Sequence, residues 1–252
     1  MEWVQFLIAG LIGACLGSFC SVLVYRIPIG EPVVLGRSKC NFCKHILSGY
    51  ELIPIVSFLL QGARCRECGD SISWTYLMRE IVFGGVCVVL FSVFGWSLDF
   101  VRFNILAVLL LSTSEIDYRH GIVPNQLVMA GVAAGSILLL FTGWNTLLLA
   151  TLASVAAFAF LMIVREGSLL IFGRIGLGMG DVKLIAMVSF FIGWHSFWAF
   201  YLATLIGGLV GLYGIATGRL YRATRIPFAP FISVGVIGAV FLYPLEVLSW
   251  FL

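Results

Sequence analysis

Charged residues are scarce in this sequence: they make up 11% of its 252 residues, against about 25% in an ordinary soluble domain. Hydrophobic residues make up 61%, and the mean hydropathy is +1.09. This composition excludes a typical soluble domain and indicates an integral membrane protein. The net charge is only +3, and the basic residues stand singly between apolar runs, so we expect no nucleic-acid partner.

The sequence also has no internal repeat, no low-complexity tract and no long acidic or basic tail. No Lys or Arg precedes the first apolar run, and no small-residue cleavage site follows it. A cleavable signal peptide would have both features. We therefore expect this run to be retained as a membrane helix, with its N-terminus outside.

Apolar runs dominate what is present. Each is long enough, or nearly so, to cross the hydrocarbon core of a bilayer as a helix, although 182–194 is short for a span. The sequence predicts an all-α polytopic membrane protein with about eight transmembrane helices, divided into a first helix (1–25), a polar insert (26–79) and a transmembrane domain (80–252). The expected spans are 3–25, 81–98, 103–116, 126–142, 146–164, 182–194, 197–217 and 228–250.

Lys and Arg are distributed unequally between the loops that these spans define. One side has only Arg102. Basic residues mark cytoplasmic loops, so the insert and the loops near 118–126, 165–183 and 219–225 are predicted to face the cytoplasm. The basic residues on that side are Arg26, Arg37, Lys39, Lys44, Arg64, Arg66, Arg79, Arg119, Arg165, Arg174, Lys183, Arg219, Arg222 and Arg225.

Glycines recur at spacings of three and four residues in two spans, from Gly10 to Gly17 and from Gly207 to Gly218. Small residues at this spacing let helices approach closely in a lipid environment. We expect close helix packing at both places.

The polar insert contains two CxxC pairs, "CNFC" with Cys40 and Cys43 and "CREC" with Cys65 and Cys68. Two such knuckles supply the four thiolates of a tetrahedral site suited to zinc. The cytoplasm is reducing, which disfavours structural disulfides, and an insert of this length gains from a structural metal. The sequence predicts a zinc-binding cytoplasmic domain, with His45 as a further candidate ligand.

Two aspartates flank or enter apolar spans, Asp117 in "SEIDYRHGIVPNQL" and Asp181 in "GLGMGDVKLIAM". Two expected spans separate them, so both return to the same side of the membrane. Two carboxylates at one depth cannot both ionise easily, and a water shared between them becomes a nucleophile toward an amide carbonyl. Simpler roles stay open: Asp181 as a helix N-cap and Asp117 as a partner of Arg119.

Five segments together resemble the type IV prepilin peptidase family, membrane aspartyl proteases of the GxGD class. They are "GSFCSVLVYRIP" (17–28), the two cysteine knuckles with "YELIPIVSFLLQGARCRECG" (50–69), "EIDYRHGIVPNQL" (115–127), "GMGDVKL" (178–184) and "IPFAPFISVG" (226–235). The order of these segments follows that of the family along nearly the whole chain. Ala229 in the last segment stands where the family more often has glycine.

The resemblance implies cleavage of the leader peptide of prepilins or prepilin-like pseudopilins at the inner face of the bacterial cytoplasmic membrane. Asp117 and Asp181 would be the catalytic pair, and Gly176, Gly178 and Gly180 would allow unusual backbone conformations beside an extended substrate. It also implies methylation of the new N-terminus with S-adenosylmethionine. The sequence has no Rossmann-type glycine fingerprint to indicate where that cofactor binds.

Two alternatives stay open at this stage. One is a non-enzymatic membrane transporter or scaffold, in which the zinc knuckle recruits a partner and the aspartates handle ions or protons. The other is a peptidase of the same family that does not methylate.

Overall fold

The computed structural model describes residues 2–173, 176–219, 221 and 226–242. The chain forms two compact units, unit 1 (residues 1–108) and unit 2 (residues 109–252). In the described part of the chain the regular elements are helices, accompanied by two isolated β-bridges and by no strand. This confirms the predicted all-α class.

Among the residues that the structure describes, eight helices of 14 residues or more correspond one to one to the expected spans. Short helical elements lie between some of them: η1 (Gly49–Leu52), α2 (Val56–Leu60) and η2 (Gly193–His195). The long helices are α1 (Glu2–Arg26), α3 (Trp74–Phe94), α4 (Leu98–His120), α5 (Asn125–Thr142), α6 (Trp144–Phe172), α7 (Met179–Ile192), α8 (Ser196–Ala216) and α9 (Ala229–Leu242).

By length and hydropathy, five candidate membrane spans lie in the described residues, and α7 and α8 fall within one of them, Met179–Ala216. Helix α4 is not among these candidates; it carries charged residues in both its first and its last turns. The part of α9 that the structure describes counts as a shorter apolar helix, and the rest of its expected span, 243–250, lies outside the described residues, as do Arg174, Arg222 and Arg225.

Several boundaries differ from the expected ones. Helix α3 ends at Phe94 rather than near 98, because Gly95 takes up a left-handed φ of 58° and closes the helix. Helix α4 begins at Leu98 rather than near 103, and its first turns include an ion pair between Asp99 and Arg102 at 3.4 Å. Hydropathy alone placed these charged residues in a loop, whereas pairing allows them to stand in the helix.

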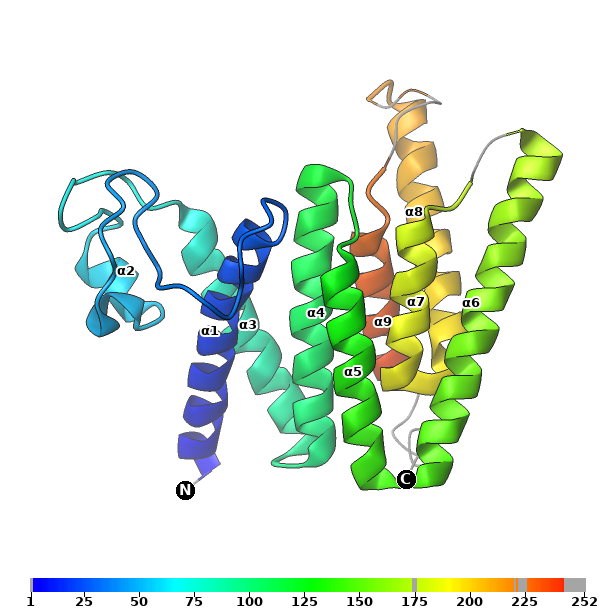
Figure 1. The fold of residues 1–252 in the computed structure, drawn as a ribbon, viewed down its shortest axis with the longest axis horizontal. Helices are drawn as coiled ribbons and strands as arrows, with labels where there is room; N and C mark the ends of the chain where they lie inside the picture. Colours follow the sequence, from blue (N-terminus) through cyan, green and yellow to red (C-terminus); the bar gives the residue numbers. More distant parts are fainter. Residues whose placement is uncertain (1, 174–175, 220, 222–225, 243–252) are drawn as a thin grey trace. The chain divides into compact units, whose positions relative to one another are not determined.

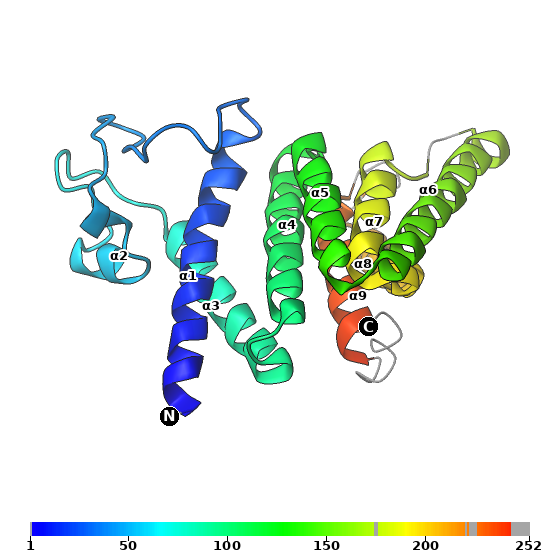
Figure 2. The same cartoon turned by 60° about the horizontal axis from the view of Figure 1, so that its bottom comes forward.

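In unit 1, α1 and α3 pack along much of their length, as both views of the ribbon show (Figures 1 and 2). Glycines of α1 make this approach possible. A Cβ atom at Gly13 would lie 2.6 Å from Cβ of Cys87, and one at Gly17 would lie 2.6 Å from the carbonyl oxygen of Arg79. The expected packing role of the first glycine series is therefore confirmed.

Helix α7 is the core of unit 2. It contacts α5, α6, α8 and α9, and in both views it lies between α5 and α6 (Figures 1 and 2). Nine of its fourteen residues are buried, which explains why it is apolar on every side. A Cβ atom at Gly131 of α5 would clash with Sδ of Met187 and lie 2.7 Å from its Cγ, and one at Gly135 would lie 2.7 Å from Cβ of Phe190. These glycines therefore set the separation of α5 and α7.

The chain reverses between α7 and α8. A continuous helix of 38 residues would be about 57 Å long, well beyond the thickness of a hydrocarbon core. Gly193 instead adopts a φ of 54°, and the 3-10 turn η2 leads into α8, which runs back past α7 (Figure 1). Two spans at this place, as the sequence predicted, are consistent with this geometry.

Helices α8 and α9 also pack closely, but the glycine that matters most lies on α9. A Cβ atom at Gly235 would clash with the carbonyl oxygen of Ala199 and lie 3.0 Å from the backbone nitrogen of Ala203. In the second glycine series, Gly207 and Gly211 contact side chains, and Gly208 faces open space. The series thus contributes less to backbone approach than its spacing predicted.

We expect Gly235→Ala to destabilise unit 2, because its added methyl group forces α8 and α9 apart. Overpacking of this kind typically costs about 1–3 kcal/mol. Thermal unfolding of the purified protein in detergent, followed by circular dichroism, would show a lower Tm. The matched control, Gly208→Ala, adds the same group where nothing lies within 4 Å, and an equal loss of Tm in both variants would contradict this packing account.

Candidate active site and metal centre

The two CxxC segments of unit 1 fold into matching knuckles. In the first, the N–H of Cys40 donates to the carbonyl of His45, and the N–H of Lys44 donates back to Cys40. The second repeats the pattern with Cys65, Asp70 and Gly69. Each knuckle is closed by one β-bridge, and its fifth residue, Lys44 or Gly69, has a positive φ. These turns direct both thiols of each pair to the same side.

The four thiols converge. All four sulfur atoms lie within 4.8 Å of one another, with Cys40 to Cys68 and Cys43 to Cys65 both 3.9 Å apart. Four thiolates at about 2.3 Å from a tetrahedral zinc ion would be about 3.8 Å apart. The cluster could therefore hold zinc with little rearrangement.

The thiols of the cluster differ in how readily they ionise. A hydrogen bond from the backbone N–H of Cys43 lowers the pKa of the Cys40 thiol to about 7. At two of the others the backbone hydrogen bonds are outweighed by burial and by hydrogen bonds with neighbouring thiols, which raise the pKa of Cys43 to about 12 and also raise that of Cys68. His45 is not part of the sulfur cluster; its Nε2 lies 3.5 Å from Oε2 of Glu51. The four cysteines are the better ligand set.

In unit 2, Asp117 lies in the last turns of α4 and is buried. Its Oδ2 accepts a hydrogen bond of 3.0 Å from the N–H of Ala229, the first residue of α9. The carboxylate is thus held at a helix N-terminus, where free N–H groups and the helix dipole favour negative charge. Sequence reasoning did not foresee this contact, because Ala229 contributes only its backbone.

Asp181 lies in the first turn of α7, at the same end of unit 2 as Asp117 and the start of α9 (Figure 1). It is near enough for the charge of Asp117 to act on it. The N-cap of α7 is Gly178, which has no side chain to cap with, so the alternative role of Asp181 as an N-cap is wrong. Both aspartates of the predicted pair therefore lie at this end of unit 2, and their catalytic role stays a prediction.

Glycine is required at positions 178 and 180 before Asp181, because a side chain there would clash with neighbouring atoms. Gly178 has a φ of −66° and Gly180 is helical, so the expectation of unusual backbone conformations is wrong at these two positions. A Cβ atom at Gly178 would lie 2.8 Å from Oδ2 of Asp181, and one at Gly180 would lie 2.7 Å from Cβ of Val123. The N–H of Gly176 is bonded to the hydroxyl of Ser168 at 2.9 Å.

The basic residues next to the two aspartates have other partners. Arg119 pairs with Glu115 one turn before it on α4, and Nζ of Lys183 donates to Oδ1 of Asn125 at 3.1 Å. The structure therefore gives no support to the alternative in which Asp117 serves only as the partner of Arg119.

Two buried acids of unit 1 were missed in the sequence. Glu51 follows Ser48 by three residues, the spacing of a capping box, and it forms that box in the structure. Glu80 lies in α3, and its Oε2 accepts a hydrogen bond of 2.6 Å from the N–H of Ile55. Glu80 directly precedes the expected span 81–98, and an ionisable residue that flanks an apolar span is itself a signal that could have identified it.

Comparison with known proteins agrees with this arrangement. The family model for the Bacterial Peptidase A24 N-terminal domain matches residues 11–94, and that for the Type IV leader peptidase family matches residues 104–243. The chain therefore belongs to the type IV leader peptidase family. This membership makes it an enzyme of the peptidase class and, with its apolar helices, a multi-pass inner-membrane protein.

Individual relatives carry the name prepilin leader peptidase/N-methyltransferase. The one from Bacillus subtilis is 32% identical over 246 residues, which cover 96% of each chain. The one from Myxococcus xanthus is 34% identical over 211 residues, covering 83% of this chain but only 63% of its own length. The one from Pseudomonas putida is 29% identical over 258 residues, covering 93% of this chain and 90% of its own. No solved structure matches the chain.

We expect Cys65→Ser to abolish stoichiometric zinc binding, since a hydroxyl is a poor substitute for a buried thiolate ligand. Zinc content per chain, measured by inductively coupled plasma mass spectrometry, should fall from about one to near zero. The matched control is Cys15→Ser, an exposed cysteine of α1 outside the cluster, which should keep its zinc. Equal zinc in both variants would refute the four-cysteine centre.

Proposed function

We propose that this protein cleaves the leader peptide from type IV prepilins or pseudopilins and then methylates the new N-terminal amine. The observation that carries the first activity is the pair of Asp117 and Asp181 at one end of unit 2, in a chain of the type IV leader peptidase family. The names of its relatives support both activities.

The aspartate pair acts on a water molecule in this mechanism. The two carboxylates share one proton because they cannot both ionise easily at close range. The ionised carboxylate takes a proton from the water as the oxygen attacks the scissile carbonyl, and the protonated carboxyl donates its proton to the carbonyl oxygen. As the tetrahedral intermediate breaks down, the carboxyl that took the proton from water donates it to the departing amine nitrogen, and the other carboxylate takes back the proton of the hydroxyl as the carbonyl re-forms. The leader and a free amine are released, and the pair again shares one proton.

The N–H of Ala229 has a distinct part in this scheme. By donating to Oδ2 of Asp117, it fixes one oxygen of that carboxylate and so orients the side chain. Asp117 is therefore the better candidate for the carboxylate that activates water. Asp181, which stands beside the glycines of the 176–180 segment, is the better candidate for the initial proton donor.

The segment that leads into α7 is the candidate docking site for the substrate. We assign the docking of the extended scissile segment to Gly176, Gly178 and Gly180, because they directly precede Asp181 in the chain. A membrane helix must unwind locally before its amide is open to attack, so an extended docking segment suits a substrate that enters from the membrane.

The second activity belongs to the polar part of unit 1 in this proposal. We assign residues 26–79 to a cytoplasmic zinc-binding domain held by Cys40, Cys43, Cys65 and Cys68, and residues 80–252 to the peptidase domain. S-adenosylmethionine, when bound, supplies the methyl group. The charge bias of the loops supports an orientation with the N-terminus outside and both this domain and the aspartate pair at the cytoplasmic face, where the basic prepilin leader lies.

The test of the peptidase is single substitution of each aspartate. We expect Asp117→Asn and Asp181→Asn each to lower the rate of leader cleavage by at least about a hundredfold, because a positioned acid or base contributes about 10²–10⁴-fold. Asparagine can still accept the hydrogen bond from Ala229, so the fold should persist. Mass spectrometry of a prepilin incubated with purified protein in detergent measures the loss of the leader.

Glu115→Gln is the matched control for both variants. It removes a carboxylate of the same helix that pairs with Arg119, and cleavage should stay within about threefold of wild type. Substantial cleavage by either aspartate variant would sink the assignment of the pair. If the wild-type protein cuts none of several pilin-like substrates, the result favours the alternative function as a transporter or scaffold.

A further inference from the structure

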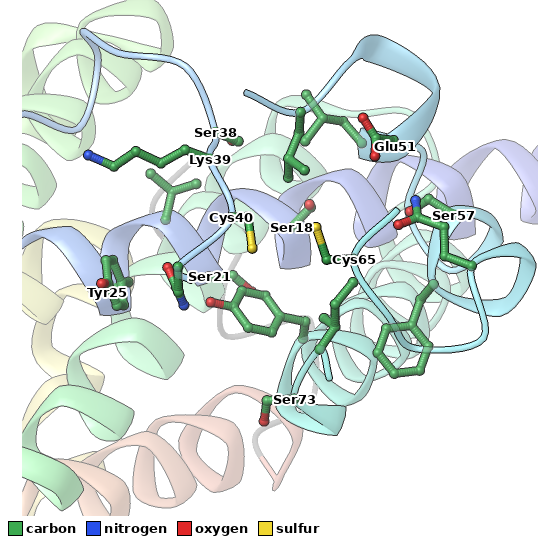
Figure 3. Close-up of a pocket in the computed structure, with 18 of the residues that line it drawn as sticks. Ser18, Ser21, Tyr25, Ser38, Lys39, Cys40, Glu51, Ser57, Cys65 and Ser73 are labelled. Atoms are coloured by element: carbon green, nitrogen blue, oxygen red, sulfur yellow. The ribbon is translucent and has the colours of Figure 1, made fainter. Parts of the chain in front are cut away.

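Unit 1 contains a cavity of about 300 Å³ beside the cysteine knuckles (Figure 3). Its walls come from the C-terminal half of α1, the two cysteine loops, η1, α2 and the first turns of α3. Its volume is at the lower end of the range for pockets that enclose a small organic ligand. The peptidase mechanism proposed above makes no use of this cavity.

Glu51 is the most unusual residue of the cavity wall. Its side chain is only 2% exposed. Both the N–H and the hydroxyl of Ser48 donate to its Oε2, at 2.8 and 2.6 Å, whereas its Oε1 is buried and has no hydrogen-bond partner among the described residues. A buried carboxylate oxygen without a donor is costly, so this position calls for a donor that a ligand would bring.

The charge of Glu51 narrows the chemistry of that ligand. The hydrogen bonds from Ser48 lower the pKa of Glu51, so it is ionised at neutral pH. An ionised carboxylate accepts hydrogen bonds and donates none. The matching ligand group is therefore an ammonium or a pair of hydroxyls.

The rest of the wall is mixed in a way that suits a nucleoside derivative. Tyr76 and Phe58 line the cavity and provide aromatic surface for a planar ring. Serine hydroxyls such as that of Ser18 provide polar contacts (Figure 3). Glu80 adds a second buried acid, while Lys39 is a partly exposed cation at the wall that can meet a carboxylate. Acids outnumber bases among the lining residues, which favours a ligand with net positive charge.

We propose that this cavity is the binding site for S-adenosylmethionine and that Oε1 of Glu51 accepts hydrogen bonds from its ribose hydroxyls or its ammonium group. The ligand combines a purine, a ribose diol, an ammonium, a carboxylate and a sulfonium cation, and the wall offers a partner of the right kind for each. The assignment rests on the proposed methyl transfer. It makes Glu51 a binding residue rather than a catalytic one.

Glu51→Gln tests this assignment. Glutamine can keep the bonds from Ser48 through its carbonyl oxygen, which leaves its NH₂ group where Oε1 stood and replaces the missing acceptor by a donor. We expect the affinity for S-adenosylmethionine and for S-adenosylhomocysteine to fall at least about tenfold, as measured by isothermal titration calorimetry on the full-length, zinc-loaded protein. Zinc content and leader cleavage should match wild type.

Glu31→Gln is the matched control. Glu31 lines the same cavity, but its side chain is 39% exposed and lies 3.9 Å from Lys39, so we expect less than about a threefold change. Equal losses in the two variants would overturn the specific role of Glu51. If Glu51→Gln binds S-adenosylmethionine as tightly as the wild-type protein does, the proposed site is wrong, but methyl transfer is not contradicted. If the wild-type protein binds neither S-adenosylmethionine nor S-adenosylhomocysteine, the proposed methyl transfer is wrong as well.

A measurement without substitutions provides a second test. Hydrogen exchange of the wild-type protein, with and without S-adenosylmethionine, should show added protection in residues 48–61 and 18–26. Protection confined to unit 2 would overturn the assignment even if Glu51→Gln failed to fold. Leader cleavage measured on the same sample separates this result from any failure of the aspartate pair.

Discussion

The close packing of α7 against its neighbours is the constraint on which the position of the aspartate pair depends. Gly131 and Gly135 let α5 approach α7, and Gly180 lets the first turn of α7 meet Val123 just after α4. In lipid there is little hydrophobic force between helices, so such small residues set the distances. Asp181 is consequently placed by the tightest-packed helix of unit 2, and Asp117 is oriented by the N–H at the start of α9. The pair is built from helix termini rather than from flexible loops.

In unit 1 the helices α1 and α3 also pack through glycines, but the polar segment between them reaches its order by different means. This segment buries few of its apolar side chains, and its knuckles are defined by backbone hydrogen bonds that repeat in the two CxxC turns. Glu80 of α3 holds the N–H of Ile55, which has a φ of 63°, a strained value for a β-branched residue. Such a conformation persists where surrounding contacts fix it. Polar contacts and the cysteine cluster thus fix the conformation of this segment, whereas helix packing fixes the positions of the elements in unit 2.

Much of this architecture follows from patterns that depend on local sequence. Apolar run length located all eight long helices, and CxxC spacing located the sulfur cluster, because both reflect constraints that neighbouring residues impose on one another. The contact between Asp117 and Ala229 could not be anticipated, since it joins residues far apart in the chain through a backbone group. The reason for the glycine at 180 was likewise mistaken: its φ is ordinary, and only the packed structure reveals Val123 opposite it. The capping-box spacing of Ser48 and Glu51 could have predicted the contact between these two residues. Nothing in the sequence indicates that one carboxylate oxygen of Glu51 has no hydrogen-bond partner among the described residues.

The cross-pairing of the knuckles has a topological consequence. Because Cys40 faces Cys68 and Cys43 faces Cys65, a metal ion bound there closes residues 44–64 into a loop, much as a disulfide would. Closing a loop in the folded state removes conformational freedom from the chain without adding any hydrophobic core. That loop contains η1, α2 and the Glu51 carboxylate. A metal ion bound to the four cysteines would therefore hold one wall of the cavity in place, and the fraction of molecules with that wall ordered would then depend on the concentration of available zinc.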